Sequence, residues 1–374
     1  MFLTYCAVSK QLNYIPNLQA RNLKKQTSTT IGVLLPSVSN PFYPSILRGI
    51  EDEAVSNNYA VLFASCDRKQ SDTDRYLQDM LEHNVRGIIT LFLEYLPEAA
   101  SLYTRHGGRS VSLVEEGTLL SHAHNITCNK VSEAFQAMQH LIQLGHRKIA
   151  YLSDSLSLNL RIHRMERFLQ TVNSAGIHSG DYIAYINGQD IPLCTGDSVE
   201  TGYILAQAML EKTPDITGIL SMNDRMSLGI IRALHEKGMS IPADLSIVSF
   251  DDLFFSEYME PPLTTMRTEK YQWGKQLMHY LLSLFAQETS EESLVISGET
   301  LLEPVTLVIR SSTAPPGKNS IFQKNRKCPQ LGTFPVFSGN IHGILTKSLF
   351  QTQDSTFSLL FLLNTLLKWP LLIC

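Results

Sequence analysis

Three side chains suited to holding a small polar ligand follow the first apolar run of the chain. The run ends at Pro36, a polar loop follows it, and Asn40, Phe42 and Tyr43 come next, where a helical pattern begins. Pro41 suits the first turn of that helix, so the pattern is a strand followed by a helix. In a parallel sheet these side chains lie at the carboxyl edge, where ligands of open α/β sheets bind.

Two pairs of adjacent acids, Glu115-Glu116 and Asp251-Asp252, come nearest to catalytic chemistry. A glycosidase needs two carboxyl groups that flank one bond. Neighbours in a strand point to opposite faces, so neither pair meets this need. The sequence also lacks the nucleophile-elbow, Walker, dinucleotide-binding and zinc-protease motifs. We therefore expect no catalytic residues.

The composition describes a protein with a large core and an uneven charge distribution. The chain has 374 residues, 44% of them hydrophobic, which suggests two or three compact units. Its net charge is −4, yet residues 1–50 contain five basic and no acidic residues. A basic N-terminal segment on an otherwise acidic chain is typical of a nucleic-acid-binding segment attached to a ligand-sensing domain. The composition alone equally allows a solvated charge cluster.

The cysteines and the N-terminal segment point to the cytoplasm. Six cysteines lie far apart without a Cys-x-x-Cys pair, so we expect no metal site and no cofactor. The first positive side chain is Lys10, so the basic start of a signal peptide is missing. We expect a cytoplasmic protein that is not embedded in a membrane.

Apolar and helical patterns alternate along most of the chain. Strand-like runs lie at about 31–35, 60–65, 87–91, 110–114, 148–153, 182–186, 217–221, 245–250 and 301–309. Helical patterns lie at 42–57, 73–84, 131–144, 159–175, 197–211, 225–237 and 270–286. This alternation predicts an α/β fold with parallel sheets covered on both faces. So many strands predict two similar lobes with a cleft between them. Asp197 is expected to cap one helix, and either Asn223 or Asp224 another.

Six motifs occur in the following order along the chain: the hinge-like 14–23, the opening 31–43, His140–Ala150, Asn223–Gly229, Phe250–Asp252 and Pro261–Thr265. Their order and approximate spacing are similar to those found in the LacI/GalR family of bacterial transcriptional repressors. The sequence therefore resembles that family over roughly residues 5–313. The resemblance implies two similar lobes like those of periplasmic sugar-binding proteins, preceded by a remnant helix and hinge. It also implies allosteric control of DNA binding and a homodimer or tetramer.

The resemblance also implies where the lobes begin and end. It places a remnant of a helix-turn-helix domain and the hinge in 1–29, the first lobe in 30–128 and 261–291, and the second lobe in 129–260 and 292–313. The chain would cross between lobes near 127–130, 258–262 and 290–298. Residues 314–374 have no counterpart in the resemblance, and we expect them to be poorly ordered or non-native sequence. A membrane-associated tail is the alternative.

The effector site implied by the resemblance draws on both lobes. The implied residues are Phe42, Tyr43 and Glu115 from the first lobe and Arg164, Asn223 and Asp251 from the second. A carboxylate accepts hydrogen bonds from neighbouring hydroxyls, a guanidinium donates in a planar fork and an amide does both, which suits a sugar or a purine-like ligand. Structural alternatives stay open: Asp251 as a cap, Arg164 as a solvated charge, and the two aromatic residues as core.

The implied DNA-binding residues are Asn17, Ala20, Arg21 and Leu23, where Leu23 matches the position that wedges into the minor groove. The chain starts inside what looks like the third helix, without the recognition helix, so we expect little operator binding by this chain alone. An unstructured linker is the alternative for this segment. The sequence thus indicates a LacI/GalR-type regulator whose partners are a small effector and, in intact relatives, operator DNA. A cytoplasmic sugar-binding protein without a DNA role and a sugar-converting enzyme are the alternatives.

Overall fold

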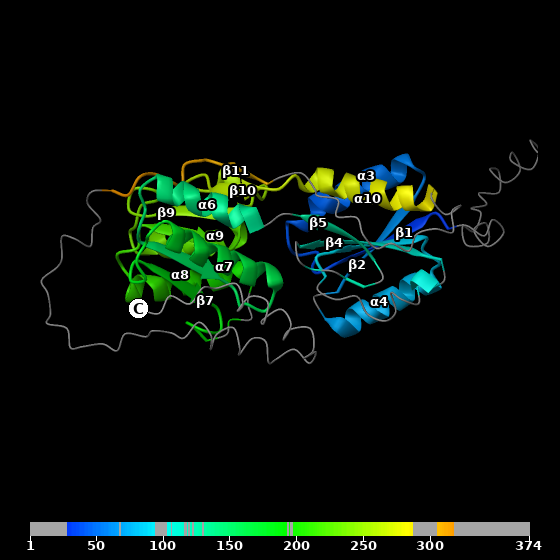
Figure 1. The fold of residues 1–374 in the computed structure, drawn as a ribbon, viewed down its shortest axis with the longest axis horizontal. Coiled ribbons are helices and arrows are strands. Elements are labelled where there is room, and N and C mark those ends of the chain that lie inside the picture. The colour runs from blue at the N-terminus through cyan, green and yellow to red at the C-terminus, as the bar shows by residue number, and fades with distance from the viewer. Residues whose placement is uncertain are drawn as a thin grey trace, which may run out of the picture.

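The computed structural model describes residues 28–66, 69–93, 103–105, 107–115, 118, 120–121, 123–128, 131–192, 194, 197–286 and 305–317. The predicted hinge, its four DNA-binding residues and the tail from 318 onward lie outside these ranges. The described elements form two lobes side by side along the longest axis of the molecule (Figure 1).

The first lobe is built on a five-stranded parallel sheet with the order β2-β1-β3-β4-β5. Its strands are β1 (Thr30–Leu35), β2 (Ala60–Ser65), β3 (Gly87–Leu91), β4 (Arg109–Glu115) and β5 (His124–Cys128). Its helices are α3 (Tyr43–Ser56), α4 (Gln70–Glu82) and α10 (Lys270–Ala286). Helices α3 and α10 cover one face of the sheet and α4 the other (Figure 1).

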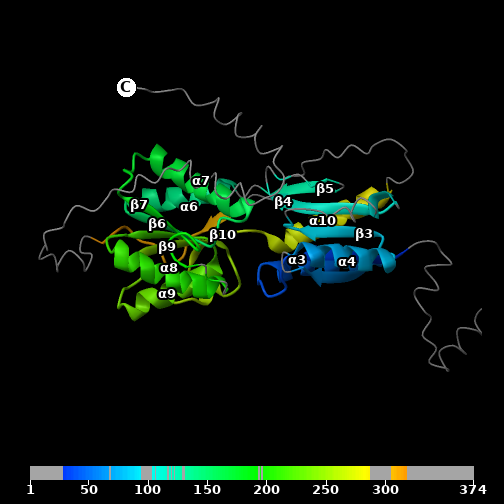
Figure 2. The same cartoon turned by 90° about the horizontal axis from the view of Figure 1, so that it is seen from below.

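The second lobe is built on a six-stranded sheet with the order β11-β10-β9-β8-β6-β7, parallel except for β11. Its strands are β6 (Ile149–Ser153), β7 (Tyr182–Ile186), β8 (Gly218–Ser221), β9 (Ser246–Asp251), β10 (Thr264–Arg267) and β11 (Thr306–Val308). Its helices are α6 (Val131–Gln143), α7 (Asn159–Ser174), α8 (Ser198–Lys212) and α9 (Asp224–Glu236), with a short 3-10 turn at Ser256–Tyr258. Helices α6 and α7 lie on one face and α8 and α9 on the other (Figure 2). The predicted α/β fold of two similar lobes is confirmed.

Burial explains why these sequences form central strands. Every residue of β3, β6 and β8 is buried, as expected for strands covered by helices on both faces. The edge strand β2 is more open, and Phe63 on it remains 55% exposed. The core itself is filled by large side chains without solvent contact, among them Trp273, Tyr151 and Phe168.

Glycines allow one pair of helices in each lobe to pack backbone against backbone. A Cβ atom on Gly49 of α3 would lie 2.1 Å from the carbonyl oxygen of Tyr271 in α10. In the other lobe, a Cβ on Gly229 of α9 would lie 1.9 Å from the carbonyl oxygen of Val199 in α8. No real Cβ tolerates such distances, so both helix pairs depend on glycine at the crossing point.

Two predicted boundaries are wrong. Strand β10 pairs with β9 and β11, so residues 264–267 belong to the second lobe rather than the first, and the chain crosses at Thr268 and Glu269 instead of 258–262. The resemblance implies a crossing before β10, and the sequence pattern does not mark this strand, because Thr264–Arg267 has a single apolar residue and follows two prolines. The second lobe also extends past 313, since Ser246 Oγ donates to the carbonyl oxygen of Ala314 at 3.0 Å. The third predicted crossing lies outside the described residues.

None of the helices among the described residues is both long enough and apolar enough to cross a membrane.

Candidate functional site

A cavity of about 230 Å³ opens between the two lobes. Its walls come from loops at the carboxyl ends of strands in both sheets and from the helices that follow them. All six predicted effector residues line this cavity: Phe42, Tyr43, Glu115, Arg164, Asn223 and Asp251. The fold therefore brings together residues that are up to 209 positions apart in the sequence, from Phe42 to Asp251.

The aromatic wall is placed by the start of α3. Phe42 is the N-cap residue of the helix, and its N–H donates to Asn40 Oδ1 at 3.1 Å, which fixes the turn that leads in from β1. The Phe42 ring meets the rings of Tyr43 and Phe92 edge to face, with centroids 5.5 and 5.9 Å away. Phe42 and Tyr43 are each only 4% exposed. They thus belong to the core and line the cavity at the same time, so the core alternative and the site prediction both describe them.

Arg164 is a buried cation on α7, not a solvated one. Its side chain is 3% exposed, one of its terminal nitrogens bonds Glu133 Oε2 at 3.0 Å, and the other donates to the carbonyl oxygen of Met222 at 2.8 Å. The guanidinium also stacks on Phe250, 3.9 Å from the ring centroid. Burial alone would lower the pKa of Arg164, but the charges of Glu133 and Asp251 outweigh it and raise that pKa. No acceptor among the described residues reaches its Nε atom.

Asn223 performs two tasks at the start of α9. Its Oδ1 accepts from the N–H of Met226 at 2.8 Å, which makes Asn223, not Asp224, the N-cap. The same side chain lines the cavity. Within the described part of the chain its Nδ2 atom makes no hydrogen bond. The cap therefore holds the amide in place while its two donor hydrogens remain available.

The adjacent acids at the end of β9 face different surroundings. Both have left-handed backbone conformations, with φ 100° at Asp251 and 44° at Asp252. Asp252 binds two arginines, Arg267 at 2.6 Å and Arg310 at 2.7 Å. Asp251 instead lines the cavity, and its carboxylate has no hydrogen-bond or ion-pair partner among the described residues. The capping alternative for this pair does not describe Asp251.

Lys270, the first residue of α10, spans the junction between the lobes. Its Nζ donates to the carbonyl oxygen of Asp251 and, at 3.2 Å, to that of Asp252. The same ammonium group lies 5.7 Å from the centroid of the Phe42 ring. Lys270 thus contacts the backbone of one cavity wall and a ring of the other.

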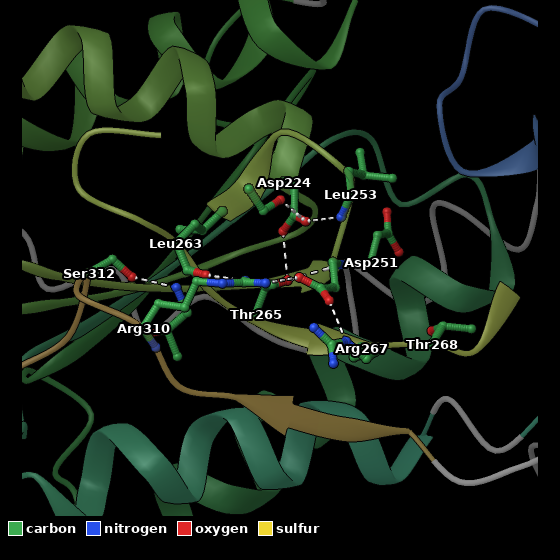
Figure 3. Close-up of polar contacts among 12 residues, drawn as sticks. Asp224, Asp251, Leu253, Leu263, Thr265, Arg267, Thr268, Arg310 and Ser312 are labelled. Atoms are coloured by element: carbon green, nitrogen blue, oxygen red, sulfur yellow. Dashed lines mark hydrogen bonds and ion pairs between the residues drawn. The ribbon is translucent and has the colours of Figure 1, made fainter. Parts of the chain in front are cut away.

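Asp224 is a fully buried carboxylate between Asn223 and Arg225, two residues that line the cavity. Figure 3 shows its polar contacts. The carboxylate accepts hydrogen bonds from the N–H of Leu253 at 2.8 Å, Ser256 Oγ at 2.6 Å and Thr265 Oγ1 at 2.7 Å. Burial first, and then the charge of Asp251, raise the pKa of Asp224 to about 7. These bonds tie the start of α9 to the loop after β9 and to β10.

The sequence reasoning missed several cavity residues, of which Arg161 and Arg225 are the charged ones. Arg161 precedes Arg164 by three positions, a spacing that places both on one face of a helix. Arg225 follows Asn223 by two positions in the same motif. Both signals were present in the sequence. The partner of Arg164 was also missed: Glu133 lies four positions before Ala137, on the apolar face of its helix.

Comparisons with known proteins agree with this fold. A family model described as a periplasmic binding protein-like domain matches residues 138–313. The transcriptional repressor PurR of Vibrio atlanticus (strain LGP32) is 28% identical over 297 residues, which cover 79% of this chain and 86% of that protein.

Two solved structures are similar over most of the chain. One is a LacI family transcriptional regulator from Enterococcus faecium with bound ribose, with a TM-score of 0.64, 26% identity and coverage of 76% of this chain and 99% of that one. The other is the lac repressor dimer bound to operator and the anti-inducer ONPF, with a TM-score of 0.66, 25% identity and coverage of 80% and 99%.

Proposed function

We propose that this chain, which belongs to the LacI/GalR family of transcriptional regulators and is not an enzyme, binds a small sugar-like effector between its lobes and couples this binding to operator DNA. The ligand-binding part is a periplasmic-binding-protein-like domain. The solved relative from Enterococcus faecium has ribose bound, which favours a sugar among polar ligands.

The observation that carries the proposal is a set of unused polar groups on one cavity. Arg164 Nε and Asn223 Nδ2 are donors without acceptors among the described residues, and the side-chain carboxylate of Asp251 is an acceptor without donors there. A buried donor without a partner costs about 1–3 kcal/mol, so a ligand that supplies one is favoured. A pair of neighbouring hydroxyls donates to a carboxylate and accepts from the two N–H groups. That is the chemistry of a polyol.

Coupling to DNA requires that the effector favour one arrangement of the lobes. A ligand held by residues of both lobes binds the closed arrangement more tightly than an open one. Because coupling is reciprocal, operator DNA then changes the affinity for the effector by the same factor. The lac repressor in the similar structure is a dimer on its operator, and we extend both the homodimer and the operator contact to this chain.

The proposal is tested by thermal unfolding with a panel of D-ribose, other pentoses, hexoses and nucleosides. A ligand at about a hundred times its Kd stabilises the folded state by about 2.7 kcal/mol. For a protein of this size we expect the Tm to rise by about 3 to 4 °C. If no member of the panel moves the Tm, the proposal is wrong.

The variant Asn223→Ser separates binding from folding. Serine also caps helices, so the unliganded Tm should stay close to that of the wild type, while loss of the Nδ2 donor removes most of the ligand-induced shift. Asn57→Ser makes the same substitution at the exposed end of α3 that is remote from the cavity, and should respond like the wild type. A full ligand-induced shift in Asn223→Ser would remove Asn223 from the site.

A further inference from the structure

We propose that the cavity selects an uncharged polyhydroxy ligand over its phosphorylated or carboxylated counterpart, and that Asp197 enforces this choice by neutralising Arg225. The inference rests on the proposed effector site and states which chemical class that site admits. It follows from how the charged side chains at the cavity are already paired.

Three arginines line the cavity in the described part of the chain, and each has a carboxylate partner from the protein itself. Arg164 pairs with Glu133 at 3.0 Å, with both side chains almost fully buried. Arg161 pairs with Asp154 at 3.2 Å, and both are less than one fifth exposed. Arg225 pairs with Asp197 at 2.9 Å, in a pair that is more open to solvent. An anionic ligand would have to compete with a protein carboxylate for each of these guanidinium groups.

The described cations that line the cavity are all paired, whereas one acid is not. Three guanidinium groups face three partner carboxylates, and the carboxylate of Asp251 has no ion-pair partner among the described residues. No lysine lines the cavity among the described residues. A phosphate or carboxylate brought into this space is repelled by the carboxylate of Asp251 and finds each arginine already paired. Solvent screens the buried charges less than it would screen exposed ones. An uncharged polyol meets no such repulsion and still satisfies the unused donors and acceptor.

Asp197 is the carboxylate whose removal changes this balance with least damage. Its Oδ1 caps α8 by accepting from the N–H groups of Val199 and Glu200 at 2.9 and 3.1 Å. Its other oxygen, Oδ2, binds Arg225 at 2.9 Å. The two oxygens thus have separate partners. Asparagine keeps an oxygen for the cap but replaces the second oxygen with an NH2 group, which cannot accept from Arg225.

The variant Asp197→Asn should therefore release a guanidinium group at the cavity while α8 stays capped. With one positive charge unpaired at the rim, the repulsion of an anionic ligand falls. Arg225 is then free to bind a phosphate or carboxylate through two parallel hydrogen bonds. The predicted change is in ligand selectivity, with little change in the binding of uncharged ligands.

The experiment measures Kd by calorimetry for matched pairs: D-ribose with D-ribose 5-phosphate, and D-glucose with D-glucose 6-phosphate and D-gluconate. In the wild type the uncharged member should bind at least about tenfold more tightly than its anionic counterpart at low salt. In Asp197→Asn this ratio should fall at least about threefold, mostly through tighter binding of the anion. Added salt should narrow the wild-type ratio.

Glu236→Gln is the matched control. It also removes one negative charge and breaks an arginine pair in the α8/α9 layer, with Arg232, but at the far end of α9 from the cavity. It should leave the selectivity ratio unchanged.

The outcomes separate this inference from the proposed function. Equal or tighter binding of the anionic member to the wild type overturns the inference and leaves the proposed effector site standing. An unchanged ratio in Asp197→Asn, or an equal change in Glu236→Gln, overturns the role of Asp197. If neither member of any pair binds, the proposed function fails and this inference with it.

Discussion

Replacing Asp224 with asparagine should make the stability of the protein less dependent on pH. Burial, followed by the nearby charge of Asp251, raises the pKa of Asp224 to about 7. The same carboxyl group in an unfolded chain has a pKa of roughly 4. The folded state therefore binds this proton more tightly than the unfolded state does. The stability that the proton confers is present in full below about pH 4 and is lost as the pH rises through about 7.

The size of the effect follows from the gap between the two pKa values. Each unit corresponds to about 1.4 kcal/mol, so a gap of about three units amounts to about 4 kcal/mol over the whole window. Between about pH 4.5 and about pH 7.5, the free energy of unfolding of the wild type should fall by about 3 kcal/mol relative to that of Asp224→Asn. Asparagine has no proton to lose, and groups common to both proteins cancel in the difference.

Urea unfolding of both proteins at four pH values across this window measures the difference directly. Asp244→Asn serves as the control for loss of a loop carboxylate, because Asp244 accepts one hydrogen bond, from the N–H of Ser240. The reasoning is refuted if the free energy of unfolding of the wild type, minus that of Asp224→Asn, stays constant or increases as the pH rises. Asp251→Asn should reduce the slope, since it removes the second cause of the raised pKa.

Two further predictions concern packing and buried charge. Gly229→Ala should destabilise the protein by about 2 kcal/mol because its Cβ would clash with the backbone of α8. Gly180→Ala is the control in thermal unfolding, because a Cβ at that position meets nothing within 4 Å. Equal Tm values for the two variants would contradict the prediction. Glu133→Gln should cost about 3 kcal/mol because it leaves Arg164 buried without its counter-charge. Glu236→Gln, which breaks an exposed pair, should change urea unfolding little, and a similar loss in both variants would show that burial is not the cause.

The fold was predictable where the apolar pattern was long. The predicted helix at 270–286 is α10 residue for residue, and the pattern at 159–175 differs from α7 by one position. Strands β5 and β10 were missed, because their sequences, HNITC and TTMR, are mostly polar and contain no apolar run. The resemblance implied a crossing at 258–262, before β10, and no local pattern corrects it, since a strand's sheet depends on its partners in space and not on its own sequence.

The site was predictable as a set of residues but not as a set of contacts. The motifs indicated Arg164, Asn223 and Asp251, and all three line one cavity. Their effector-binding role stays a prediction. Arg164 and Glu133 lie on two different helices and are 31 positions apart in sequence. No local sequence pattern can reveal a pair at that separation. Asp224 gave no sign of its burial either, because an acid at the start of a helix is usually solvated.

The hydrogen bonds of Lys270 connect the two lobes directly. The ammonium group belongs to helix α10 of the first lobe, and it donates to the carbonyl oxygens of Asp251 and Asp252 at the end of β9 in the second lobe. Any displacement of Asp251 must therefore either move the start of α10 with it or break these hydrogen bonds. Because α10 packs closely against α3 at Gly49 and Gly274, the two helices would move together as one rigid unit.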